Sequence, residues 1–167
     1  MSEPPAGSAA SGAARSHAPV IIGWREWIAL PDFGIRAIKA KIDTGAASSA
    51  IHAFDVQVVE HDGRRHASFE IHPNQRSNRR AIRVEAPILG ERSVRSSTGH
   101  AQTRYVVQMN LVLLDRCWTA EVTLARRDQL GFRMLLGREA LRGRFLVDPD
   151  ASFVGGRRPR GAERSER

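Results

Sequence analysis

The segment from residue 35 to residue 49 constrains the fold more than any other part of this chain. Apolar residues alternate with one arginine and two lysines up to Ile42, a pattern typical of a half-buried β-strand. This strand delivers Asp43 into a tight turn of small and hydroxyl residues, Thr44-Gly45-Ala46-Ala47-Ser48-Ser49. An aspartate at the end of an apolar strand is unusual unless its charge is used, since such carboxylates are rarely buried. Asp43 is therefore the candidate catalytic residue.

The sequence Asp43-Thr44-Gly45 occurs once in the 167 residues. Peptide hydrolysis by carboxylates needs two of them close together and sharing one proton. If Asp43 is one half of such a pair, the other half must come from another molecule.

Most of the remaining chain also has the pattern of short β-strands between turns. Apolar and β-branched residues indicate strands at 20–30, within 50–59, and at 67–72, 82–89, 105–114, 118–124, 134–136 and 143–148. The predicted turns include Pro31-Asp32-Phe33-Gly34 and the hairpin His61-Asp62-Gly63-Arg64. Residues 94–107 predict a long hairpin with its tip near Thr98 and Gly99, and residues 138–142 predict one or two helical turns. We expect an all-β, closed barrel-like domain with one short C-terminal helix.

The two ends of the chain differ in composition from the middle. Residues 1–19 are mostly Ala, Gly, Ser and Pro, and residues 156–167 are mostly Gly, Arg, Glu, Ser, Pro and Ala, which predicts two disordered tails. Residues 20–155 then form one domain of ordinary size. The sequence contains neither a secretion signal nor an apolar run long enough for a membrane helix, and it has one cysteine, so a cytoplasmic protein is expected.

The net charge of +8 is concentrated in the middle of the chain and in the second tail. The arginines of the middle third are Arg64, Arg65, Arg76, Arg79, Arg80, Arg83, Arg92, Arg95 and Arg104. Such a field would attract acidic polypeptide or nucleic acid, or it is simply a solvated surface. With one Tyr and six Phe, the chain offers no aromatic stacking platform for single-stranded nucleic acid.

Three segments together resemble the retropepsin-like aspartic proteases. They are residues 39–50 around Asp43, residues 95–106 with Gly99 inside the predicted hairpin, and residues 134–149, which begin Met134-Leu135-Leu136-Gly137-Arg138. The likeness is greater to a bacterial group labelled ATP-dependent zinc proteases, which are found beside ATP-grasp glutamate ligases of the ribosomal-protein-modifying type. It covers nearly all of residues 20–155 and implies an acid-protease fold.

The resemblance implies a homodimer in which Asp43 and its symmetry mate activate a water molecule. Thr44 would cross-link the two turns, Gly45 would let the substrate backbone approach, and Leu135, Leu136 and Gly137 would brace the turn from behind. Ala46 offers no hydroxyl to the carboxylate, where the pepsin type has Ser or Thr, so activity nearer neutral pH is expected. In compact viral members, the arginine at the position of Arg138 pairs with an acid two residues after the catalytic glycine. That position is Ala47 here, so Arg138 must find another partner.

The predicted hairpin would be a flap that closes over the substrate. Its tip, Thr98-Gly99, would supply flexibility, and the cationic groups near the cleft would be Arg95, His100 and Arg104. The alternative is a surface hairpin whose arginines only keep it soluble. A basic cleft would suit a peptide or protein substrate with acidic or glutamate-rich tails, added by an associated ATP-grasp ligase.

No cofactor is expected. Five histidines are present in the folded part, yet the sequence contains neither a His-Glu-x-x-His motif nor paired cysteines, so no metal site is predicted. No glycine-rich phosphate loop is present either. Three hypotheses remain: a dimeric aspartic peptidase, a zinc-dependent hydrolase, and a catalytically inactive retropepsin-like module that binds peptides.

Overall fold

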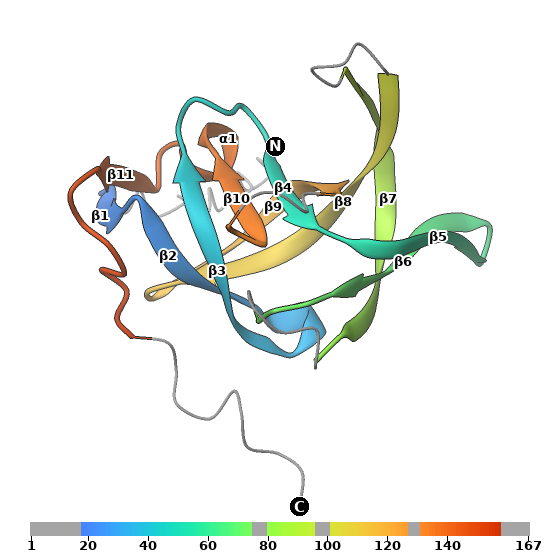
Figure 1. Ribbon diagram of the computed structural model, residues 1–167, viewed down its shortest axis with the longest axis horizontal. Helices are drawn as coiled ribbons and strands as arrows, with labels where there is room; N and C mark the ends of the chain where they lie inside the picture. Colours follow the sequence, from blue (N-terminus) through green and yellow to red (C-terminus); the bar gives the residue numbers. More distant parts are fainter. Residues whose placement is uncertain (1–17, 75–79, 96–100, 127–130, 158–167) are drawn as a thin grey trace, which may run out of the picture.

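A computed structural model describes residues 18–74, 80–95, 101–126 and 131–157. In these residues the chain forms eleven strands, one 3-10 helix and one four-residue α-helix (Figure 1). The elements are β1 (Val20–Gly23), β2 (Arg25–Leu30), η1 (Pro31–Phe33), β3 (Ile35–Asp43), β4 (Ser49–His52), β5 (Phe54–His61), β6 (Arg64–Ile71), β7 (Ile82–Arg95), β8 (Ala101–Leu113), β9 (Arg116–Ala125), β10 (Met134–Gly137), α1 (Arg138–Leu141) and β11 (Phe145–Asp148). The predicted all-β architecture with one short helix is confirmed.

Nine strands form one sheet in the order β2-β3-β10-β4-β9-β8-β7-β6-β5. A further pairing of β2 with β8, at Ala29 and Val112, closes the first six strands into a ring. Fully buried side chains from all around the ring form the core, among them Ile28, Ile38, Ile51, Leu111 and Leu136. The hairpin of β5 and β6 extends to one side of the ring, joined to it through β7 (Figure 1).

The strand predicted at residues 20–30 is instead two strands that belong to different sheets. β1 pairs in parallel with β11, whereas β2 joins the large sheet. The break occurs where the backbone lies against the C-terminal segment: Trp24 N donates to Ala151 O at 3.0 Å. A Cβ on Gly23 would lie 2.4 Å from that oxygen, so only glycine fits here. Local pattern did not reveal this contact, since the two segments lie far apart in the chain.

The strand expected within residues 50–59 is also two strands, β4 and β5. β4 lies between β10 and β9, while β5 pairs with β6 only. Asp55 has a left-handed φ of 45° at the start of β5, and this conformation redirects the chain. The apolar alternation continues through the bend, so it could not show where the pairing partner changes.

The two predicted hairpins are present. Asp62 and Gly63 both have positive φ, 51° and 72°, as the two-residue turn between β5 and β6 requires. β7 and β8 form the long hairpin, but β7 is a single strand that also includes the separate strand predicted at residues 82–89. The predicted tip at Thr98 and Gly99 lies outside the described residues.

β8 and β9 pair as expected around Asp115. The predicted helical turn after Gly137 is α1. Over the described ranges, no helix combines the length and apolar character needed to cross a bilayer.

Candidate active site

β3 places Asp43 at the edge of the core. Ile42 is buried at 5% exposure, and Asp43, the last residue of β3, is half-buried. On one side β3 pairs with β2, and on the other it pairs in parallel with β10, where Gly137 lies beside Asp43. Two strands from distant parts of the chain therefore fix the backbone that carries this carboxylate.

The turn after β3 holds one oxygen of the carboxylate. Asp43 Oδ1 accepts hydrogen bonds from the backbone N–H of Gly45 at 3.1 Å and of Ala46 at 3.2 Å. Among the described residues Oδ2 accepts none. Thr44 and Gly45 are exposed, so the turn presents its carboxylate toward the outside of the protomer.

α1 and the end of β10 brace the turn from behind. The backbone N–H of Arg138 donates to Ala46 O at 2.9 Å, and that of Glu139 donates to Ala47 O at 3.1 Å. The guanidinium of Arg138 donates to the carbonyls of Thr44 and Gly45, each at 3.3 Å. Ala47 offers Arg138 no carboxylate, and the backbone carbonyls of the turn accept its hydrogen bonds instead.

Ser49 is a structural residue of this site that the sequence interpretation missed. It is buried at 2% exposure, and its Oγ accepts a hydrogen bond from Gly137 N at 3.1 Å. A serine facing the core immediately after the turn was the available signal, because a buried hydroxyl needs a hydrogen-bond partner. Leu135 and Leu136 are buried in β10 behind the turn.

We expect Gly137→Ala to destabilise the protein by about 2 kcal/mol or more and to displace the Asp43 turn. A Cβ at Gly137 would lie 2.5 Å from Ser48 C and O, and backbone atoms cannot rotate away. Chemical denaturation measures the loss. Gly90→Ala in β7 is the matched control, because a Cβ there meets nothing within 4 Å. Equal stability of the two variants would contradict the close packing.

The residues predicted for the flap are only partly placed. Arg95 ends β7 and pairs with Ala101, and Arg104 lies in β8 opposite Arg92. Thr98, Gly99 and His100 lie outside the described residues. Figure 1 shows the β7–β8 hairpin rising on the same side of the ring as the turn after β3. The structure brings Asp43 and residues 135–138 together.

Two of the described histidines serve packing, whereas the exposed His61 pairs with Glu85 at 2.9 Å. His52 and His72 are buried at 1% and 7% exposure and stack on the two faces of Phe54, with ring centroids 4.1 and 4.0 Å away. No group of three His, Cys, Asp or Glu side chains suited to a metal ion occurs within the described ranges.

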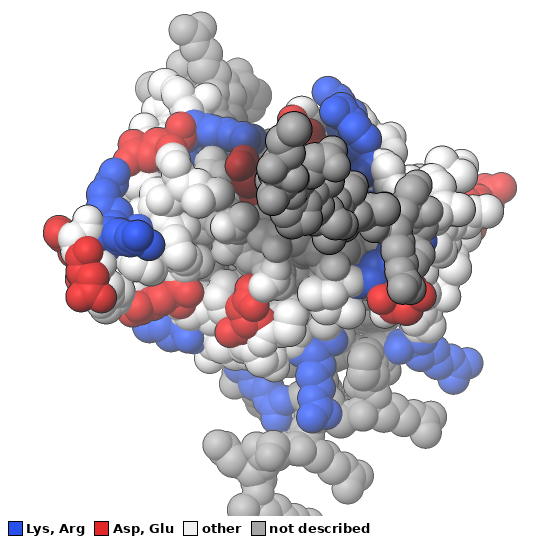
Figure 2. All heavy atoms as spheres, turned by 180° about the vertical axis from the view of Figure 1, so that it is seen from behind, with Lys and Arg blue, Asp and Glu red and all other residues white. Residues whose placement is uncertain are grey.

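Charges of both signs are mixed on the face seen from behind in Figure 2. Lysine and arginine side chains there are interspersed with carboxylates and do not form one continuous basic surface. The positive charge on this face is therefore distributed over separate sites.

Comparison with known proteins adds a family to this geometry. A family model described as RimB-like, for the retropepsin-like aspartic endopeptidase RimB, matches residues 21–158. A solved structure from Legionella pneumophila, described as a protein of unknown function (DUF785), superposes with a TM-score of 0.69. It is 28% identical, and the alignment covers 81% of this chain and 98% of that one.

Curated relatives carry a different name, probable alpha-L-glutamate ligase. One from Parasynechococcus marenigrum is 49% identical over 133 residues, which are 80% of this chain and 28% of that protein. One from Desulfotalea psychrophila is 44% identical over 129 residues, covering 77% of this chain and 28% of the relative. This chain therefore spans less than a third of the length of these relatives.

The match to the family model extends over nearly the whole folded part and includes the Asp43 turn, β10 and α1. This chain belongs to the RimB-like family of retropepsin-like aspartic endopeptidases.

Proposed function

We propose that this chain is an aspartic peptidase whose catalytic pair is formed by Asp43 of two copies across a twofold axis. The observation that carries the proposal is the state of Asp43: one oxygen is held by two backbone amides, and the other accepts no bond from the described residues. One such carboxylate is one of the two catalytic groups, and a symmetric dimer would supply the second.

The chemistry follows from bringing the two carboxyl groups about 3 Å apart, where they cannot both ionise and so share one proton. The ionised group takes a proton from a bound water, and the water oxygen attacks the carbon of the scissile peptide. The protonated group gives its proton to the carbonyl oxygen. When the tetrahedral intermediate collapses, the group that took the water proton gives it to the nitrogen, the other group takes a proton from a hydroxyl of the intermediate, and the C–N bond breaks to release a free amine and a carboxylic acid.

The turn would orient this chemistry. The amides of Gly45 and Ala46 fix the plane of the Asp43 carboxylate, and Arg138 holds the carbonyls of Thr44 and Gly45. Thr44 is exposed, and in the proposed dimer its hydroxyl would bond the partner's turn. Gly45 has no side chain, so a substrate backbone can approach closely.

An acidic, glutamate-rich polypeptide is the proposed substrate. The curated relatives are named as glutamate ligases, and the segment shared with this chain is just over a quarter of their length. We infer that ligation belongs to the rest of those proteins and that the shared segment acts on glutamate-containing products. The arginine excess would favour such a substrate.

The dimer requirement can be tested by the dependence of rate on protein concentration. Cleavage of a fluorogenic glutamate-rich peptide should rise with the square of protein concentration below the dimer dissociation constant and linearly above it. Light scattering at the same concentrations gives the mass. Activity from a species of protomer mass would contradict the proposal, and cleavage abolished by a chelator would favour a zinc hydrolase instead. A correctly assembled dimer that cleaves no peptide would be a binding module.

A further inference from the structure

A hollow of about 290 Å³ lies beside the first residues of β8, and none of its lining residues belongs to the turn that carries Asp43. The first residues of β8, the start of β5 and the end of β9 form its walls. Its size is at the lower end for ligand pockets, so it suits one side chain or a small ion more than a cofactor. The lining residues on which the argument depends are Asp55, Val56, Arg104, Tyr105, Leu124 and Arg126.

Arg104 is a cation of this hollow that has no ion pair with a carboxylate among the described residues. It lies directly opposite Arg92 in the β7–β8 ladder, and like charges in that position repel. Arg92 pairs with Glu121 at 3.3 Å, whereas among the described residues the side chain of Arg104 bonds the side-chain oxygen of Gln102 alone, at 3.5 Å. The Nε of Arg104 is buried without a hydrogen-bond partner in the described residues. Such a guanidinium is stabilised by an anion.

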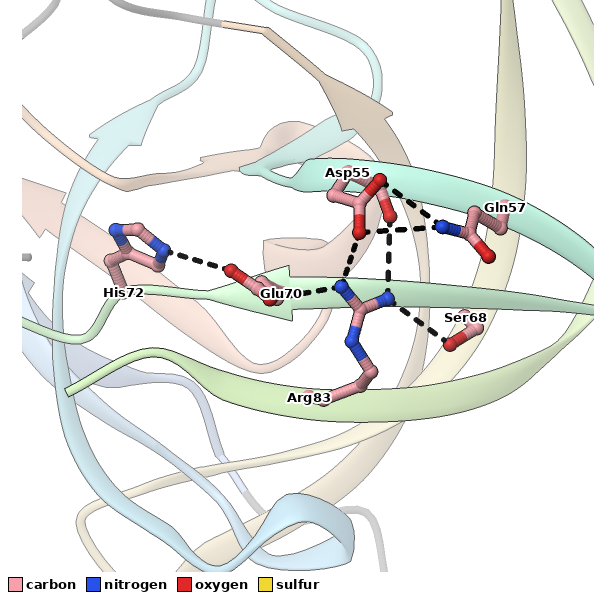
Figure 3. Close-up of polar contacts among 6 residues, drawn as sticks. All are labelled: Asp55, Gln57, Ser68, Glu70, His72 and Arg83. Atoms are coloured by element: carbon pink, nitrogen blue, oxygen red, sulfur yellow. Dashed lines mark hydrogen bonds and ion pairs between the residues drawn. The ribbon is translucent and has the colours of Figure 1, made fainter.

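Arg126 adds a second guanidinium to the same walls. It has no ion pair within the described ranges. The nearby acid, Asp55, does not balance these two charges, because Arg83 already binds it (Figure 3). Arg83 also bonds Glu70 at 2.9 Å, and hydrogen bonds from Arg83 and then from Gln57 lower the pKa of Asp55. The hollow therefore carries excess positive charge.

We propose that this hollow binds a side-chain carboxylate of an acidic polypeptide, with Arg104 as the principal donor. A guanidinium and a carboxylate match in geometry and form two parallel hydrogen bonds. Val56 and Leu124 offer apolar surface for the methylene stem of a glutamate. A carboxylate on a methylene stem fits better than an inorganic phosphate, because a phosphate has no apolar part to contact Val56 and Leu124.

The position of the hollow determines which residue of the substrate would bind in it. β4 runs from the Asp43 turn to the hollow, and four strand residues span on the order of 10–15 Å at about 3.3 Å each. An extended peptide covers that distance in three to five residues. The acidic side chain would therefore lie that far from the scissile bond. The role in cleavage rests on the proposed peptidase function, while the binding of the carboxylate does not.

The test uses Tyr105, which lines the hollow and is the single tyrosine of the chain. Fluorotyrosine labelling of the full chain with Asp43→Asn gives one fluorine signal, which should shift saturably on titration with hexaglutamate and remain unchanged with hexaglutamine. Arg104→Gln should weaken hexaglutamate binding about tenfold or more, as expected for loss of a hydrogen bond between charged groups. Arg92→Gln removes the same charge from the neighbouring strand and should change binding by less than about threefold.

Several outcomes would overturn the site. Equal weakening by Arg104→Gln and Arg92→Gln would indicate a general electrostatic field. Inorganic phosphate that produces the same shift and displaces hexaglutamate would identify a phosphate site, and a fluorine signal that never moves would exclude a ligand here. Cleavage assays use the chain with its natural Asp43. There, Arg104→Gln should raise KM with kcat unchanged. If hexaglutamate binding depends on Arg104 but no peptide is cleaved, only the proposed peptidase function is refuted. If peptides are cleaved at a rate that does not depend on Arg104, only the proposed carboxylate site is refuted.

Discussion

In the proposed dimeric peptidase, replacing Asp43 by asparagine will abolish peptide hydrolysis and leave the fold and the dimer intact. Asparagine cannot take a proton from water, and loss of acid–base catalysis alone lowers rates by about 10²–10⁴-fold. The asparagine oxygen can still accept the amides of Gly45 and Ala46, so the turn should persist. Initial rates on a glutamate-rich peptide, together with light scattering, measure both effects.

Asp62→Asn is the matched control for this change. Asp62 is exposed in the β5–β6 turn with a φ of 51°, which asparagine adopts readily, so activity should stay at the level of the natural chain. Mixing Asp43→Asn protein with the natural chain should also depress activity, because mixed dimers hold a single carboxylate. Residual hydrolysis by the purified variant at near-normal rates would refute the role of Asp43.

Replacing Glu26 by alanine will destabilise the protein more than any other single change considered. Glu26 is fully buried, and its carboxylate accepts backbone N–H groups from Gly23 at 2.7 Å, Val154 at 2.9 Å and Gly155 at 3.2 Å. Alanine would leave the buried N–H of Gly23 and the part-buried N–H groups of Val154 and Gly155 without this acceptor, each costing up to about 1–3 kcal/mol. The total, roughly 3–6 kcal/mol, is a large part of the stability of an ordinary domain.

Urea denaturation measures this loss, and hydrogen exchange should show early opening of β1 and of residues 153–155. Glu60→Ala is the control, because Glu60 is exposed on β5 and should change stability by less than about 0.5 kcal/mol. Similar unfolding midpoints for the two variants would show that the Glu26 contacts contribute little.

The break between β1 and β2 shows why parts of the fold were not predictable from the sequence. Residues 20–30 are mostly apolar or aromatic in the manner of one strand, and the interruption depends on Ala151, more than a hundred positions later. Glu26 was missed for the same reason, since its partners are at 154 and 155. An acid in a strand pattern gives no sign of which backbone amides it will meet.

The sequence by itself determined the strand content, the Asp62-Gly63 turn, the helical turn after Gly137 and the placement of Asp43 at a strand end. Each of these follows from residue periodicity or from local backbone preference, which act over a few neighbouring positions. Only the tertiary structure decided that β10 lies between β3 and β4, that Ser49 and Arg138 fasten the turn, and that Arg104 has no carboxylate partner among the described residues. These features depend on which distant segments pair, and pairing is selected by the packing of the whole core.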